Sequence, residues 1–422
     1  MVKDDDTMKY LILLASTIFP MLFFSFTSLV GVEFGGSDES PLYMIACVAV
    51  NLLVVGIVLK GFVYKQLRIT GKLLLIVLVQ MLLPILFLLE DPHMIFARKS
   101  LPLVFAFSAP VCYVGYYMAQ TKTWSNVLKW LDIIMVLITM SLTISMPSIL
   151  SEKAYAEIAG ETAVTNLNYQ IASYYASLAY AINLLLMTHG HIIKERFKIF
   201  ASKKFTIISI LLLFVQITLC LMSGGRGGFV VIFMASIITW FISNRRDFRK
   251  ILSKLAAIGL VGIISLVLLK PSVIETVSEI LAKSTERTFA YISRDGIDMS
   301  QTSGRDAIYG EVIDGILKSP IWGYGVLGYN TFFSRDGYPH NIILEMLMQG
   351  GFLYLFLFLG IVAFQFAKYK RMIKYEKSNI FLIPFICYAG TMLMFSGSYM
   401  TMGLFWFLLV YIYTYRFKVN SP

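Results

Sequence analysis

Long apolar runs alternate with short polar segments along nearly the whole chain. Runs of roughly 17 to 25 apolar residues have the length that an α-helix needs to cross a bilayer. About twelve runs of this kind predict about twelve transmembrane helices. They lie approximately at residues 10–30, 42–60, 73–89, 101–119, 127–146, 168–188, 205–222, 227–243, 251–269, 341–366, 380–397 and 399–415. Prolines inside or near these runs, such as Pro20, are expected to kink the helices, because neighbouring helices can satisfy the freed backbone groups.

Composition supports an all-α polytopic membrane protein. Of the 422 residues 58% are hydrophobic and 14% are charged, and the mean hydropathy is +0.74, values typical of polytopic membrane proteins. The formal charge is +11, but the basic residues lie between apolar runs instead of forming one stripe with stacking aromatics, so no nucleic-acid partner is expected. The four cysteines lie inside apolar runs without paired spacing, which supports neither a disulfide framework nor a zinc site.

The distribution of charge predicts the orientation of the chain in the membrane. With both termini in the cytoplasm, 25 of the 36 Lys and Arg residues fall on the cytoplasmic side and 18 of the 25 acidic residues fall on the outer side. Short cytoplasmic loops rich in Lys and Arg follow the positive-inside rule. The first residues are acidic and no small-residue cleavage pattern follows the first apolar run, so this run is expected to stay as a helix.

The predicted helices divide the chain into three parts. Residues 1–269 contain helices 1–9, residues 270–340 form a large extracytoplasmic loop with an amphipathic helix, and residues 341–422 contain helices 10–12. In this topology the polar loop and the glycine turn at 223–228 both face outward. Chemistry, if the chain performs any, is therefore expected outside the cytoplasmic membrane.

The glycine turn Ser223-Gly224-Gly225-Arg226-Gly227-Gly228 joins two predicted membrane helices. Its glycines permit a tight turn with exposed backbone N–H groups. The following helix begins here, so its positive dipole end and Arg226 converge on one point, an arrangement suited to an anion such as a phosphate. The alternative is a tight hairpin whose arginine extends to lipid headgroups.

A second arginine lies at a predicted helix start in the outer loop. Ser303 and Asp306 have the spacing of a capping box, and apolar residues from Ile308 to Leu317 repeat with amphipathic helical spacing. Arg305 then lies in the first turn, where its guanidinium and the free N–H groups favour an anion. The alternative is a solvated charge paired with a nearby aspartate. Two further loop arginines and a tryptophan are weaker candidates for substrate contacts, namely Arg287, Arg294 and Trp322.

His340 follows Pro339 at the start of a long apolar run. A helix N-terminus disfavours imidazolium, so this histidine is expected to be neutral and able to accept a proton. Its alternative role is to cap the helix. Asn341, Glu345 and Gln349 recur every four residues and predict a polar stripe facing an interior cavity. Glu345 is a candidate substrate contact, or else it pairs with a basic loop residue that fixes the helix.

Taken together, these segments resemble the O-antigen ligase and Wzy-type O-antigen polymerase superfamily. The resemblance rests on the glycine-arginine turn, on Gly304-Arg305, on the Ile316–Gly325 run, and on His340-Asn341 ahead of Leu344-Glu345 and Gly350-Gly351. These motifs cover roughly residues 223–352. The rest of the chain shares only the pattern of about twelve helices with one large outer loop.

The resemblance implies an inverting glycosyltransferase of the GT-C type that needs no metal or other cofactor. Its donor would be a glycan on undecaprenyl diphosphate, and its acceptor a second glycan. Arg226 and Arg305 match the diphosphate-binding arginines of the family, and His340 matches its proposed catalytic base. Asn341 and Glu345 would contact substrate. A flippase or a chain-length regulator would be a natural partner, and the bacterial cytoplasmic membrane the natural location.

Three functions fit these residues to different degrees. A polymerase joins one lipid-linked repeat unit to another, and we favour this activity because it is the more frequent of the two. A ligase moves the finished glycan to a different acceptor and uses the same catalytic residues. A flippase or other transporter is disfavoured because it should place ionisable residues near the bilayer midplane, often in a repeated pattern. In this chain the informative residues gather in the predicted outer segments.

Overall fold

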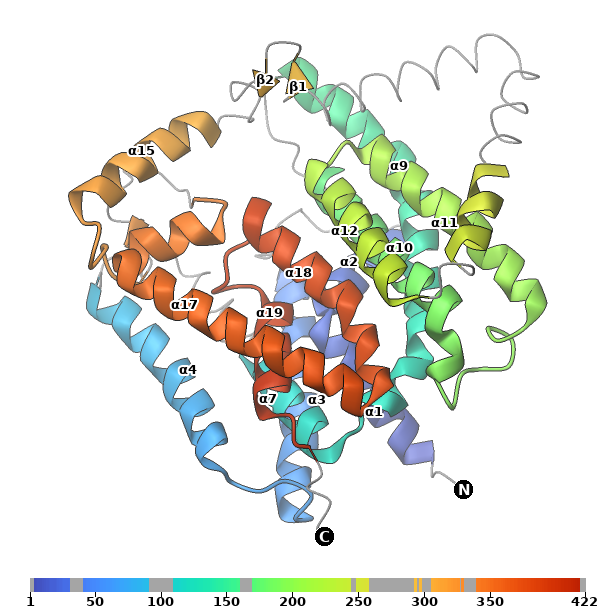
Figure 1. Ribbon diagram of the computed structural model, residues 1–422, viewed down its shortest axis with the longest axis horizontal. Coiled ribbons are helices and arrows are strands. Elements are labelled where there is room, and N and C mark those ends of the chain that lie inside the picture. Colours follow the sequence, from blue (N-terminus) through green and yellow to red (C-terminus); the bar gives the residue numbers. More distant parts are fainter. Residues whose placement is uncertain are drawn as a thin grey trace.

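The computed structural model describes residues 4–30, 41–90, 109–159, 169–243, 248–257, 292–293, 296–297, 305–326, 328–329 and 339–417. Within these ranges the regular structure is almost entirely helical (Figure 1). Strands β1 (Ile292–Ser293) and β2 (Gly296–Ile297) form one short antiparallel pair, with Ile292 opposite Ile297. The expectation of an all-α protein is confirmed apart from this pair.

The helices follow the apolar runs of the sequence. In the first half of the chain they are α1 (Asp4–Thr17), α2 (Phe19–Leu29), α3 (Pro41–Val63), α4 (Gly71–Glu90), α7 (Pro110–Thr121), α8 (Trp124–Val127), α9 (Leu131–Ala159), α10 (Tyr169–His189), α11 (Lys203–Ser223) and α12 (Arg226–Ile242). In the second half they are α15 (Arg305–Lys318), α17 (Ile342–Tyr375), α18 (Ile383–Phe395) and α19 (Gly403–Thr414). Short 3-10 helices occur at η1 (Leu128–Trp130), η2 (Gly190–Ile192) and η4 (Lys377–Leu382).

Six of the described helical segments are long and apolar enough to cross a membrane, and a seventh if the bent pair α1 and α2 forms one span. That pair bends by 98° next to Pro20, so the kink expected there is a sharp break. Three further apolar helices are shorter, within α4, α12 and α19. The chain is a multi-pass membrane protein. The number twelve stays a prediction, since part of the expected span 101–119 and most of the span 251–269 lie outside the described residues.

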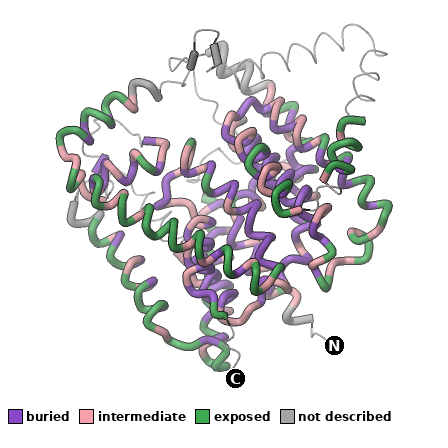
Figure 2. The backbone as a smooth tube through the Cα atoms, in the orientation of Figure 1, coloured by how far each residue is buried: buried purple, intermediate pink, exposed green. Residues whose placement is uncertain are grey.

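Helix α10 forms the centre of the bundle and packs against α9, α11, α12 and α18. Its most apolar stretch is 83% buried within the protein, whereas that of α17 is only 17% buried. Figure 2 shows the same contrast between the buried middle of the bundle and the exposed lengths of α4 and α17. Small buried residues of α10, such as Ala172, Ser173 and Ala176, allow neighbouring backbones to approach closely. The outer helices instead present apolar side chains to lipid.

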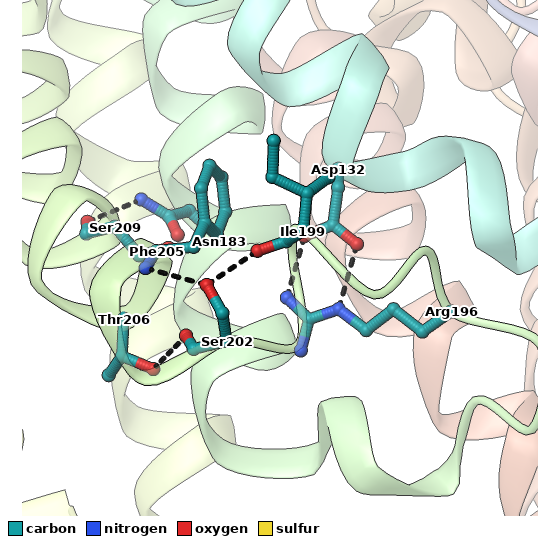
Figure 3. Close-up of polar contacts among 8 residues, drawn as sticks. All are labelled: Asp132, Asn183, Arg196, Ile199, Ser202, Phe205, Thr206 and Ser209. Carbon is teal, nitrogen blue, oxygen red and sulfur yellow. Dashed lines mark hydrogen bonds and ion pairs between the residues drawn. The ribbon is translucent and has the colours of Figure 1, made fainter.

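Polar contacts tie the helices together near the C-terminal end of α10 (Figure 3). The guanidinium of Arg196 donates to both carboxylate oxygens of Asp132, at 2.8 and 2.6 Å. Within the bundle, Nδ2 of Asn183 donates to the backbone oxygen of Ser209 at 2.9 Å. Ser202 caps α11 by accepting from the backbone N–H of Phe205 at 3.1 Å. The bonds of the Asp132 carboxylate and of Asn183 Nδ2 satisfy groups on fully buried side chains, where an unsatisfied group is costly.

Candidate functional site

The glycine turn predicted from the sequence connects α11 to α12. Gly224 ends α11 with a φ of 67°, and Gly225 is the N-cap of α12. Arg226 is the first residue of α12, and its side chain is half-buried. A glycine at the N-cap supplies no capping side chain, so the positive end of the helix dipole lies beside this guanidinium. The helix start predicted at Arg226 is confirmed, and anion binding there stays a prediction.

The glycines of this turn are required by the close approach of α10. A Cβ on Gly227 would collide with the hydroxyl of Tyr174, and one on Gly228 would collide with Ser173. The hydroxyl of Ser173 donates to the backbone oxygen of Gly225 at 2.7 Å. This packing holds Arg226 in place through its backbone.

At the start of α17, Asn341 is the N-cap and His340 precedes it. The Oδ1 atom of Asn341 accepts from the backbone N–H groups of Ile343 and Leu344, at 2.9 and 3.2 Å. The capping role considered for His340 is therefore filled by Asn341. His340 has a φ of 51°, which is uncommon for a non-glycine residue, and its Nδ1 atom is buried. Backbone strain of this kind persists where the surrounding structure holds it.

Glu345 and Gln349 of the polar stripe are buried in the protein interior, as expected, and the cavity expected beside them stays a prediction. Glu345 is fully buried, and its Oε1 atom accepts from the hydroxyl of Ser398 at 2.5 Å. Gln349 accepts from the hydroxyl of Tyr399 at 2.5 Å through its Oε1 atom. Within the described residues, the partners of the stripe lie in the connection between α18 and α19. The ion pair with a basic loop residue that the sequence offered for Glu345 stays untested, because most of that loop lies outside the described residues.

Further bonds bring the glycine turn and the start of α17 to the same end of the bundle. The Tyr174 hydroxyl, which contacts the turn, lies 3.2 Å from the hydroxyl of Ser396 at the end of α18. Nδ2 of Asn341 donates to the backbone oxygen of Met394 at 3.3 Å. We call this region, where α12 and α17 both begin, the α12–α17 end. It brings Arg226 and His340 to one end of the protein.

A break in α17 explains why two of the sequence motifs occur together. Gly350 and Gly351 have non-helical backbone angles, with φ at 60° in Gly351. The Pro320–Gly325 turn fills the break: the backbone N–H groups of Tyr324 and Gly325 donate to the oxygens of Met348 and Gln349, both at 2.8 Å.

The N–H of Phe352 donates in return to the oxygen of Pro320 at 2.8 Å. Each motif therefore satisfies backbone groups that the other leaves free. The result is a short half-helix, Ile342 to Gly350, set apart from the rest of α17 and carrying the polar stripe.

The structure describes only some of the remaining candidate residues. Arg305 is the first residue of α15, so the expected amphipathic helix is present, and α15 packs on α17. Ser303, its expected N-cap, lies outside the described residues, as do Arg287 and Arg294. Trp322 lies in the turn that fills the break of α17, and its side chain is 74% exposed. Asn341 and Glu345 each make a side-chain hydrogen bond within the fold.

Sequence reasoning missed the residues that connect these segments. Ser173 and Tyr174 read as ordinary parts of a membrane span, and nothing in their spacing marks them as supports of the glycine turn. Ser398 and Tyr399 belong to a short polar turn that was visible in the sequence but had no predicted partner. Pairing them with the Glu345 stripe would have required knowing which helices are neighbours.

Comparison with known families agrees with this geometry. A family model described as O-antigen ligase matches residues 207–359, from α11 to the middle of α17. This match supports membership of the O-antigen ligase superfamily. No curated protein and no solved structure gave a match. The matched segment contains the glycine turn, α15, the Pro320–Gly325 turn and the start of α17. Membership supports an enzyme of the glycosyltransferase-like ligase and polymerase type.

Proposed function

We propose that this protein is a polymerase of undecaprenyl-diphosphate-linked oligosaccharide repeat units. It would act by inverting glycosyl transfer at the outer face of the bacterial cytoplasmic membrane, with both termini in the cytoplasm and a GT-C-type fold. The observation that carries the proposal is the O-antigen ligase match over 207–359, because that stretch holds both segments that meet at the α12–α17 end. Capsule, O-antigen or exopolysaccharide would be the product.

In the proposed reaction His340 is the general base. A hydroxyl oxygen of the acceptor sugar attacks the anomeric carbon of the donor and gives its proton to the imidazole. The bond between that carbon and the diphosphate oxygen breaks, and its electron pair leaves with undecaprenyl diphosphate. Attack from the face opposite the leaving group inverts the configuration. A diphosphate is a stable anion, so its departure needs neither a proton from an acid nor, in this proposal, a metal ion.

Arg226 and Arg305 are the proposed diphosphate ligands. Each is the first residue of a helix, where the dipole and the terminal N–H groups add to the charge of the guanidinium. Fixed donors of this kind contribute most where charge grows during the reaction. The half-buried position of Arg226 in a turn held by Ser173 supports its part of the proposal.

Other residues would orient the site or contact the glycan. Asn341 caps α17 and bonds to Met394, so we propose that it sets the position of the neighbouring His340. Glu345, fixed by Ser398, would hold the half-helix in the same way. Arg287 and Arg294 stay proposed glycan contacts, whereas Trp322, which is 74% exposed among apolar neighbours, fits a membrane contact better. A flippase that delivers the lipid-linked units and a chain-length regulator are proposed partners.

Ligation is the second candidate, because the matching family model is described as O-antigen ligase. A ligase would transfer the finished glycan to a different acceptor with the same base and the same arginines. Incubation of the purified protein in nanodiscs with lipid-linked repeat units and a chelator distinguishes the polymerase from the ligase. A ladder of longer lipid-linked glycans supports the polymerase, whereas product that forms only after a second acceptor is added supports the ligase.

The Arg226→Ala variant is the control for both outcomes, since trace contaminants would give the same product with either protein. Absence of glycan transfer with any acceptor, from protein that keeps its fold, would contradict both candidate functions.

A further inference from the structure

Helix α15 has three faces. Val312 and Ile316 are buried, with 0% and 8% exposure, on the side that packs on α17. Asp314 and Lys318, four residues apart, form an exposed charged stripe. A third stripe lies between these two and is apolar: Ile313 is 50% exposed and Leu317 is 71% exposed. A helix in water would not be expected to keep an apolar face next to a charged one without a partner for it.

The apolar stripe continues into the turn that follows α15. Ile321 is 57% exposed and Trp322 is 74% exposed. We call Ile313, Leu317, Ile321 and Trp322 the apolar patch. A cluster of large exposed apolar side chains marks a surface that contacts another protein or a membrane. A tryptophan at its edge is typical of the boundary between membrane and water.

The position of the apolar patch relative to the membrane-spanning part of α17 points to the membrane as its partner. The patch is tied to the α17 break by the bond from the Phe352 N–H to Pro320. From Phe352 to Ala367 α17 has 16 residues and no charged one, a length of about 24 Å at 1.5 Å per residue. Lys368 follows at the far end. The apolar core of a bilayer is about 30 Å thick, so this stretch spanning most of the core would place the break and the patch near one of its boundaries.

The patch is also continuous with the lipid-facing surface of α17. Phe352 and Phe356 follow the break directly and are 46% and 67% exposed. The upper left of Figure 1 shows α15 beside the start of α17, on the outside of the bundle. An occupant other than lipid would have to cover the patch and leave its apolar neighbours on α17 in the bilayer.

We infer that the apolar patch inserts into the leaflet at the N-terminal end of α17, with Asp314 and Lys318 toward water. Helix α15 then lies in the membrane interface as a peripheral anchor. Because the turn after α15 fills the break in α17, this anchor sets the depth of Gly350 and Gly351 below the headgroups. The half-helix that begins beside His340 takes its depth from the same contact. The inference does not depend on the reaction that the protein catalyses.

Nitroxide spin labels on single cysteines in the full-length protein in nanodiscs test this inference. Leu317→Cys and Trp322→Cys report on the patch, Asp314→Cys on the same helix is the water-facing control, and Phe356→Cys is the lipid-facing reference. The native cysteines are all buried, so the unsubstituted protein labelled in parallel gives the background. Power saturation measures the collision of each label with oxygen, which enriches in lipid, and with a water-soluble nickel chelate.

We expect the ratio of oxygen to nickel accessibility at positions 317 and 322 to exceed that at 314 several-fold and to approach that at 356. A ratio equal to that at 314 would overturn the inference. Labels shielded from both reagents, with spin–spin broadening, would overturn it in favour of a second copy of the chain. Ile313→Cys provides the same readout should Trp322→Cys fail to fold.

Discussion

The two ends of α10 carry polar groups of different kinds. At the C-terminal end both carboxylate oxygens of Asp132 are bonded to Arg196, and the two side chains are 0% and 14% exposed. At the N-terminal end α10 supports a glycine turn with the half-buried Arg226, and α17 begins beside a strained His340. In the ion pair of Asp132 and Arg196 the two charged groups bind each other and so stabilise the fold. At the N-terminal end we propose that the arginine binds an anion beside a helix N-terminus and that the histidine accepts a proton. Stability and activity should therefore separate between the two ends.

The largest expected effect on stability is at the closed pair. Arg196→Ala leaves the buried Asp132 carboxylate without its cation, and removing one partner of a buried ion pair costs about 3–5 kcal/mol. Denaturation in mixed micelles should show this fall in the free energy of unfolding. The double variant Arg196→Ala with Asp132→Asn should recover part of it. If Arg196→Ala kept its stability but lost glycan transfer, the C-terminal end of α10 would serve activity and not stability.

Arg226→Ala should have the opposite effect, a large loss of activity with little change in stability. Turnover falls about 10²- to 10³-fold, the usual effect of removing one fixed donor from a site of growing charge. The free energy of unfolding should stay near that of the parent protein, since the turn is held by backbone contacts to α10. Steady-state rates with lipid-linked substrate measure the effect, and Arg226→Lys should be intermediate because it keeps the charge but not the fork geometry. A variant as active as the parent would remove Arg226 from the site.

Gly351→Ala should affect both properties. Its φ of 60° is unfavourable for alanine, and the added Cβ would collide with the backbone of Ile321. Strain of this kind costs about 1–3 kcal/mol, and the half-helix beside His340 should shift with it. The matched control is Gly360→Ala in the same helix, where a Cβ meets nothing within 4 Å. Equal unfolding free energies for the two variants would contradict the described break.

A smaller effect is expected at the buried stripe. Ser398→Ala removes the donor to Glu345, and a buried acceptor left without its bond costs about 1–3 kcal/mol. A double-mutant cycle with Glu345→Gln measures the coupling, expected at about 0.5–3 kcal/mol for residues in contact. Ser253→Ala, at an exposed site, should change stability by less than about 0.5 kcal/mol. Additive effects at positions 345 and 398 would argue against the bond.

Local features of the fold followed well from the sequence. The runs at 205–222 and 227–243 predicted α11 and α12 within two residues at each end, because apolar length and the glycines between them are both local signals. The start of α15 was predicted by the capping-box spacing of Ser303 and Asp306, and its course by the amphipathic spacing that follows. The break in α17 was not, although its glycines were noted, because it depends on the Pro320–Gly325 turn, which is distant in sequence.

The candidate site divides in the same way. Arg226 could be found because a lone arginine among glycines at a helix start has a local physical meaning. The sequence offered His340 as an alternative N-cap of α17, but the N-cap is Asn341, one residue later. His340 instead has a left-handed backbone conformation. The partner of Glu345 depended on which helices are neighbours, and the sequence alone predicts no such neighbour.

The central claim is that the α12–α17 end performs glycosyl transfer with His340 as its base. It is tested most directly by comparing His340→Gln with His191→Gln, an exposed histidine near the other end of α10. Both purified variants are given lipid-linked repeat units and the glycan products are separated by length. We predict a loss of about 10²- to 10⁴-fold in rate for His340→Gln and parent-like products for His191→Gln. Parent-like products from His340→Gln would contradict the account.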